Sequence, residues 1–199
     1  MSLHFACVKG DLNKISELLQ NPNIDLESED NNGKELLIYA CENNQASVVQ
    51  IFLEDGRVDP SDALFYVCGC GKTDIVKIFL QEFRGDLNVK NNRGQTPFGV
   101  ACSSGCVDTV RLFLDDDRID VNQPNIDGKT PFFVACCNPN ICNDNQRYIN
   151  VVKLLIDNER INPMQPDNKR TTPFRYVCSQ SNKLIPIFVG SDRMCKLYS

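Results

Sequence analysis

The stretch that decides the fold is GQTPFGVACSSGCVDTVRLFL, residues 94–114 of the 199-residue chain. Its second half spaces apolar side chains three and four residues apart, which is typical of an amphipathic helix with a broad buried face. Its first half begins with Thr96 and Pro97. Threonine caps free helix N–H groups, and proline suits the first helical position. The stretch therefore predicts a short helix, a tight turn and a second helix.

This pattern recurs along the chain, with a cysteine at the same point of each unit. The cysteines lie 34, 27, 34, 34 and 42 residues apart: Cys7, Cys41, Cys68, Cys102, Cys136 and Cys178. Segments such as SVVQIFL (47–53), DIVKIFL (74–80) and NVVKLLI (150–156) follow them as second helices. Helices of about nine residues are too short to be stable alone in water. Stacked units can bury one another's faces, so the repeat predicts an elongated all-α solenoid.

The stretch 94–114 resembles the ankyrin repeat, whose motif runs Gly-x-Thr-Pro-Leu-His-x-Ala, followed by a glycine turn and a second helix rich in valine and leucine. The resemblance covers nearly the whole chain as a single domain, 1–199. Its six repeats are approximately 1–29, 30–59, 60–90, 91–124, 125–166 and 167–199, with atypical first and last repeats. The resemblance implies helix-turn-helix units joined by β-hairpin-like loops, called fingers below, and a concave groove that binds other proteins.

The chain departs from this motif in several places. The motif's histidine remains only at His4 and is replaced elsewhere by Ile38, Phe65, Gly99, Phe133 and Arg175. Hydrogen bonds that this histidine makes between neighbouring turns should therefore be missing or remade. The connection before the third repeat has no room for a full finger, and residues 138–145 are inserted between the helices of the fifth. Pro186 should break or kink the last second helix.

The recurring cysteines allow three interpretations: a metal ladder, a disulfide ladder or a packing position. Stacked helices lie about 8–10 Å apart, whereas a disulfide needs Cα atoms within about 4.4–6.8 Å and zinc needs ligands that converge on one point. Cysteine is also small and readily buried. We therefore predict a packing position. Cys136, Cys137 and Cys142 leave open a zinc or redox site, and Cys142 an exposed, modifiable thiol.

The composition narrows the classes of partner. The net charge is −5 and the pI about 4.9, and no cluster of lysine and arginine suits a phosphate backbone, so nucleic acid is not expected as a partner. No apolar run reaches the roughly 18 residues of a membrane span, so membrane insertion is not expected. The eleven cysteines are an odd number, and the start lacks the layout of a secretory signal. We expect a reducing, cytoplasmic location.

The sequence offers little for catalysis. His4 is the only histidine, which restricts any nucleophile–histidine pair to the N-terminus. There is no phosphate-binding glycine loop and no His-Glu-x-x-His motif. We predict no catalytic residues, no cofactor and no metal site, and therefore no enzyme.

The resemblance implies that a partner contacts the finger tips and the exposed ends of the first helices. The predicted protein-binding residues are Asn32, Lys34, Glu42, Asn92, Arg93, Gln95, Ser103, Ser104, Ile126, Asp127, Lys129, Asn168 and Lys169. Ile126 stands out because an apolar side chain at a turn tip gains most when a partner covers it. Arg93 stands out because arginine is enriched at binding hot spots. The acidic run 115–117 opposes a helix dipole, which indicates either a basic partner or a solvated turn.

We therefore expect a monomeric scaffold or adaptor that binds another protein. The alternative is an ankyrin portion that targets or regulates a larger signalling protein or enzyme.

Overall fold

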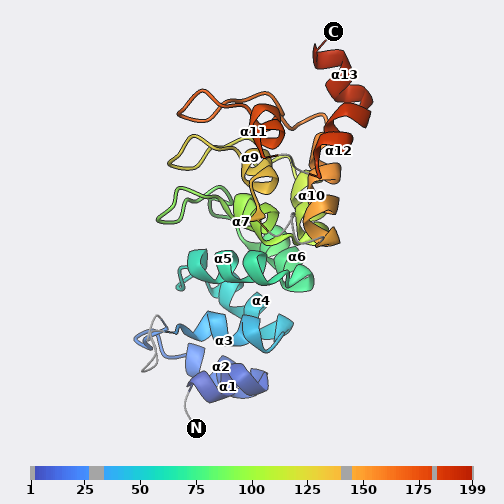
Figure 1. Cartoon of the computed structure of the whole chain (residues 1–199). Helices are drawn as coiled ribbons and strands as arrows, with labels where there is room; N and C mark the ends of the chain where they lie inside the picture. The colour runs from blue at the N-terminus through green and yellow to red at the C-terminus, as the bar shows by residue number, and fades with distance from the viewer. Residues whose placement is uncertain (1–2, 27–33, 140–144, 181–182, 199) are drawn as a thin grey trace. The chain divides into compact units, whose positions relative to one another are not determined.

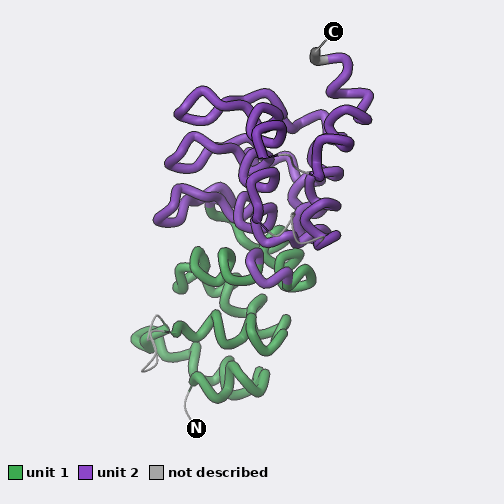
Figure 2. Tube along the Cα trace, in the orientation of Figure 1, with its two compact units in different colours: residues 1–67, 72–85 green, residues 68–71, 86–199 purple. Residues whose placement is uncertain are grey.

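The computed structural model describes residues 3–26, 34–139, 145–180 and 183–198 (Figure 1). All regular elements in these ranges are α-helices. The chain divides into two compact units, shown in separate colours in Figure 2. Unit 1 comprises residues 1–67 and 72–85, and unit 2 comprises residues 68–71 and 86–199.

Unit 1 is built from antiparallel helix pairs. Its helices are α1 (Leu3–Lys9), α2 (Leu12–Leu19), α3 (Leu36–Glu42), α4 (Ala46–Asp55), α5 (Ser61–Cys70, whose last turn belongs to unit 2) and α6 (Thr73–Glu82). Helix α1 packs against α2 and α3, and α4 packs against α2, α3 and α6. Residues 56–60 alone join α4 to α5, so the expected lack of a full finger at this point is confirmed.

Unit 2 holds two rows of helices. Its helices are α7 (Pro97–Ser104), α8 (Val107–Leu114), α9 (Pro131–Cys136), α10 (Gln146–Ile156), α11 (Pro173–Ser179), α12 (Ile185–Gly190) and α13 (Asp192–Tyr198). The first helices α7, α9 and α11 contact one another in sequence, and α8 contacts α10. Three fingers, residues 88–96, 122–130 and 164–172, project beside the row of first helices (Figure 1).

Three threonines start the first helices of unit 2 as the sequence predicts. The Oγ1 atoms of Thr96, Thr130 and Thr172 accept hydrogen bonds from backbone N–H groups three residues on, at 3.1, 3.2 and 3.3 Å. A proline follows each threonine at the first helical position. Each cap satisfies a donor that the helix leaves unpaired, so the finger-to-helix junction is fixed three times in the same way.

The cysteine series is a packing position in five of its six members. Cys7, Cys41, Cys68, Cys102 and Cys136 are fully buried. Burial raises the pKa of Cys7 and of Cys41 to about 12, so both are neutral thiols at pH 7. The sixth prediction is wrong, because Cys178 on α11 is exposed. Among the described residues, the helices after α11 are α12 and α13, and neither is a first helix that stacks on α11 as α11 stacks on α9.

The prediction that Pro186 breaks or kinks the last second helix is wrong. Pro186 lies in the first turn of α12, where its missing N–H costs nothing. Extended backbone at Ser191 then separates α12 from α13.

Side chains tie neighbouring repeats together at the ends of the second helices and at the bases of the fingers. Arginines reach back to carbonyl oxygens at the end of the preceding second helix: Arg57 to Leu19, Arg160 to Leu114, and Arg193 to Ile156. Asn88 Nδ2 donates to the Arg118 carbonyl oxygen and Asn122 Nδ2 to that of Arg160, at 2.8 and 2.7 Å. None of these side chains stands at a histidine position of the motif, so the expectation about that histidine's own hydrogen bonds stays a prediction.

Candidate functional site

The fingers of unit 2 share one internally fixed turn. Asn91 Oδ1 accepts from the backbone N–H groups of Arg93 and Gln95, at 2.9 and 3.0 Å. Asn125 does the same for Asp127 and Lys129, both at 3.0 Å. The third finger uses Asp167 in the equivalent place. Side chains that bond their own backbone two residues on stabilise turns without outside help. The finger tips are therefore pre-ordered.

Neighbouring fingers in unit 2 are also bonded to one another. The Ile126 N–H donates to the Arg93 carbonyl oxygen at 3.3 Å. Asn168 donates its backbone N–H to the Asp127 carbonyl oxygen and its Nδ2 to that of Ile126, both at 3.0 Å. Gly94 has φ 68°, and a Cβ atom there would lie 2.8 Å from the Ile126 nitrogen. The tips approach this closely because glycine occupies that turn.

A groove of about 520 Å³ lies between the first two of these fingers and the ends of α7 and α9. Its lining includes six predicted contact residues: Arg93, Gln95, Ser103, Ile126, Asp127 and Lys129. Ile126 is 67% exposed, which is unusual for an isoleucine and leaves apolar surface uncovered at the groove. The Lys129 ammonium lies 5.5 Å from the centre of the Phe133 ring, which holds the charge over the helix α9.

A smaller hollow of about 170 Å³ continues from this groove to the third finger. Asp127 and Lys129 line both. Asp167 and the predicted contact residues Asn168 and Lys169 complete the smaller one. Eight of the thirteen predicted residues thus line two adjoining depressions within unit 2.

Comparison with known proteins identifies the fold. Residues 2–62 and 64–163 match the family described as ankyrin repeats (3 copies). The chain belongs to the ankyrin repeat family. Ankyrin repeats are generally protein–protein interaction modules, and they are typically not enzymes. No curated protein matched the sequence.

Solved ankyrin repeat structures superpose on most of the chain. The ankyrin repeat protein EF0377 is 26% identical, with a TM-score of 0.76 over 95% of this chain and 96% of that one. An ankyrin repeat domain from Acinetobacter baumannii AYE is 24% identical, with a TM-score of 0.72 over 90% and 91%. The ankyrin repeat domain of Bcl-3, a member of the IkappaB family, is 22% identical, with a TM-score of 0.78 over 94% and 83%. The prediction of an all-α ankyrin-repeat solenoid is confirmed.

The remaining predicted contact residues lie outside the groove. Asn92 is exposed at its finger tip, and Ser104 is half-buried at the end of α7. In unit 1, Lys34 Nζ lies 2.8 Å from Glu42 Oε1 and 5.0 Å from the centre of the Tyr39 ring, so these two predicted residues pair with each other. Asn32 lies outside the described residues.

The sequence interpretation missed several residues that line the groove, chiefly Val134, Cys137 and Asn138. The repeat period could have predicted two of them, because Cys137 and Asn138 follow the predicted contact residues Ser103 and Ser104 by one repeat of 34 residues. Asn138 Nδ2 donates to the Ser103 carbonyl oxygen at 2.6 Å, which joins the ends of the two first helices. Burial raises the pKa of the Cys137 thiol to about 12.

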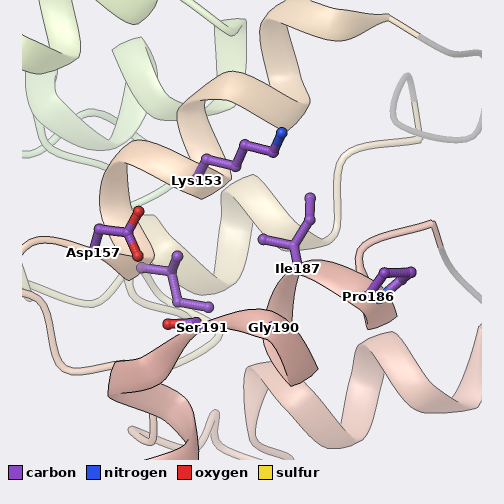
Figure 3. Close-up of a pocket in the computed structure, with 7 residues that line it drawn as sticks. Lys153, Asp157, Pro186, Ile187, Gly190 and Ser191 are labelled. Atoms are coloured by element: carbon purple, nitrogen blue, oxygen red, sulfur yellow. The ribbon is translucent and has the colours of Figure 1, made fainter.

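A second depression, of about 360 Å³, lies on the other row of helices (Figure 3). Lys153 and Asp157 come from α10, and Pro186, Ile187 and Ser191 come from α12 and its end. Figure 3 shows the α10 side chains facing those of α12 across it. No predicted contact residue lies here.

The structure also bears on the hypotheses about a metal site, the acidic run at 115–117 and a membrane-spanning segment. Among the described residues, no group of three or more histidine, cysteine, aspartate or glutamate side chains is arranged to hold a metal ion, and Cys142 lies outside that part of the chain. In the acidic run, Asp116 pairs with Arg118 at 2.6 Å, and Asp117 lies 3.9 Å from Arg160. Within the described ranges, no helix is long and apolar enough to cross a membrane.

Proposed function

We propose that this ankyrin repeat chain is a non-catalytic scaffold or adaptor that binds a partner protein through the groove and finger tips of unit 2. One observation carries the proposal. Six residues chosen from the sequence as partner contacts line a single groove of about 520 Å³. They come from two consecutive fingers and the end of α7.

The groove is suited to binding because its walls are ordered beforehand. The tips are held by Asn91 and Asn125 and by the bonds between fingers. A partner therefore loses little affinity to the ordering of loops. The exposed Ile126 supplies apolar area to bury, and Arg93 supplies a side chain common at binding hot spots.

The chemistry of the groove supports a non-catalytic role. Cys137 is the nucleophilic side chain of the lining with the greatest intrinsic reactivity, but its raised pKa keeps it a neutral thiol. The thiolate, not the thiol, is the nucleophile. The only histidine of the chain, His4, belongs to unit 1.

Quantitative affinity capture tests the proposal. The wild type is compared with an Arg93→Ala, Gln95→Ala, Ile126→Ala variant and with a control, Arg111→Ala, Asn150→Ala, Leu154→Ala, whose sites line a depression on α8 and α10. We expect a partner that wild type and control retain and the groove variant loses. A partner that all three retain, or none at all, would contradict binding at this groove; the second result would favour the regulatory portion of a larger protein.

We also propose that the chain works as a monomer in a reducing, cytoplasmic environment. Its ten described cysteines are all free thiols, and Cys70, Cys178 and Cys195 are exposed. Exposed thiols persist where glutathione and thioredoxin keep them reduced. Light scattering of the reduced protein checks the monomer, and imaging of the tagged protein in its native cell checks the location.

A further inference from the structure

The fingers of unit 2 carry a charge opposite to that of the chain. The finger strip is defined here as residues 88–96, 122–130 and 164–172. It contains five basic residues, Lys90, Arg93, Lys129, Lys169 and Arg170, and two acidic ones, Asp127 and Asp167, for a net charge of +3. The whole chain has a net charge of −5. Positive charge is therefore concentrated on the fingers that line the groove and the adjoining smaller hollow.

These cations are not neutralised within the described part of the protein. The ion pairs there involve other residues, such as Arg118 with Asp116 and Lys34 with Glu42. Asp167 Oδ1 already accepts two backbone N–H groups of its own finger. The Lys129 ammonium lies over an aromatic ring and shares its hollow with Asp127 and Asp167, but it forms no ion pair with either among the described residues. The strip thus has positive charge available to a partner.

Apolar surface lies among these charges. Ile126 is bonded through its backbone to Arg93 in the finger before it, and its exposed side chain shares the groove with Val134 and Lys129. The groove lining thus combines this isoleucine with two cations, Arg93 and Lys129, and one anion, Asp127. An excess of positive charge around an exposed apolar side chain favours a ligand with an apolar side chain flanked by anions.

We infer that the partner presents an acidic segment of protein, in which carboxylates flank one aliphatic or aromatic side chain. The carboxylates meet Arg93 and Lys129, with arginine able to bind bidentately. The apolar side chain covers Ile126 and Val134. The inference rests on the proposed function and specifies the partner's chemistry. A protein segment fits better than a nucleic acid because the uncovered apolar side chains are aliphatic, whereas single strands stack on aromatic ones.

Peptide selection on the whole chain tests the inference. A random library of peptides about 12 residues long is selected on the wild type, and binding constants of the enriched peptides are measured. We expect enriched peptides with net negative charge and a shared apolar residue. Their dissociation constants should rise by about tenfold or more in Arg93→Glu, Lys129→Glu, because attraction becomes repulsion. Raising sodium chloride from about 50 to about 500 mM should weaken them too.

The control variant Arg111→Glu, Lys153→Glu reverses two charges on α8 and α10, and thermal unfolding verifies that each variant is folded. If the enriched peptides were neutral or basic and lost binding in Ile126→Asp, the inference of an acidic partner would be wrong, while binding at the groove would be supported. Peptides that bind the groove variant and the control equally would overturn both the inference and the proposed function. If a single-stranded oligonucleotide competed with the peptides as well as an acidic peptide does, the assignment to a protein segment would be wrong, because binding to the finger strip would then depend on negative charge alone.

Discussion

The Arg160 guanidinium closes the end of α8: its Nη1 donates to the Leu114 carbonyl oxygen at 2.8 Å, across 46 residues of sequence. The same group reaches the carbonyl oxygens of Asp116 and Ile119, at 3.0 and 2.7 Å. The last carbonyls of a helix have no partner within the helix, so an outside donor satisfies them. One side chain of the fifth repeat thus completes the second helix of the fourth.

Arg160→Met should lower the free energy of unfolding by about 1–3 kcal/mol, because carbonyl oxygens at the end of α8 lose charged donors. Urea denaturation followed by circular dichroism measures the loss. Arg111→Met is the matched control, because Arg111 is exposed on α8, and we expect a change below about 0.5 kcal/mol. Equal losses in the two variants would show that the reach across repeats adds nothing.

Arg170→Gly should stabilise the protein by about 0.5–1 kcal/mol. Arg170 has φ 60°, a left-handed conformation that costs a non-glycine residue energy, and Gly94 and Gly128 occupy the same place in the other two fingers. Gly128→Ala should do the opposite, since a Cβ atom there would lie 2.7 Å from the Asn168 nitrogen. The midpoints of thermal unfolding of both variants are compared with that of the wild type, and a lower midpoint for Arg170→Gly would contradict the expectation.

The stability difference between wild type and Cys41→Ala should depend on pH. Burial raises the folded-state pKa of Cys41 from about 9 to about 12, so the folded protein holds the thiol proton more tightly than the unfolded chain. The stability from the buried neutral thiol is therefore complete below about pH 9 and falls between about pH 9 and 12, by up to about 1.4 kcal/mol per pH unit. The advantage of wild type over Cys41→Ala should shrink by about 1 kcal/mol or more from pH 8 to pH 10.5. Between pH 6 and pH 8, where the thiol is protonated in both states, the difference should stay constant, and a constant difference up to pH 10.5 would contradict the expectation.

Maleimide should label the native protein unevenly. Cys70, Cys178 and Cys195 are exposed and should react first, whereas Cys102 and its buried equivalents should react only after unfolding. Peptide mapping by mass spectrometry after short labelling times gives the order. Labelling of Cys102 as fast as Cys178 would contradict the packing role.

Ile126→Ser should separate binding from stability. The side chain is 67% exposed, so the free energy of unfolding should change by less than about 0.5 kcal/mol while partner binding weakens. Ile119→Ser, at a position 3% exposed, should cost about 2–4 kcal/mol. A large loss of stability in Ile126→Ser would mean that its role is structural.

Repeated features could be predicted from the sequence because each occurs several times. Thr96, Thr130 and Thr172 cap helices as expected, and the period of 34 residues located the buried Cys102 and Cys136. The same reasoning failed at Cys178, because the described residues include no first helix after α11 that would cover it. The sequence period identifies equivalent positions in successive repeats, but it does not show whether a neighbouring helix covers each of them.

The ties between repeats could not be predicted, because their acceptors are backbone carbonyls without a sequence signature. Nothing in the residues around Arg160 indicates the Leu114 carbonyl oxygen, and nothing around Asn122 indicates that of Arg160. The groove is an intermediate case. Arg93 and Ile126 were identified one finger at a time, but their meeting with Val134 and Asn138 depends on how the repeats stack.

The reach of Arg160 back to α8 has a consequence during synthesis. Translation delivers the chain from the N-terminus, so the end of α8 emerges with open carbonyls and stays open until Arg160 follows, 46 residues after Leu114. Arg193 stands in the same relation to Ile156 at the end of α10. The second helix of each of these repeats therefore leaves the ribosome without these C-terminal hydrogen bonds and acquires them only when the arginine of the next repeat has been synthesised.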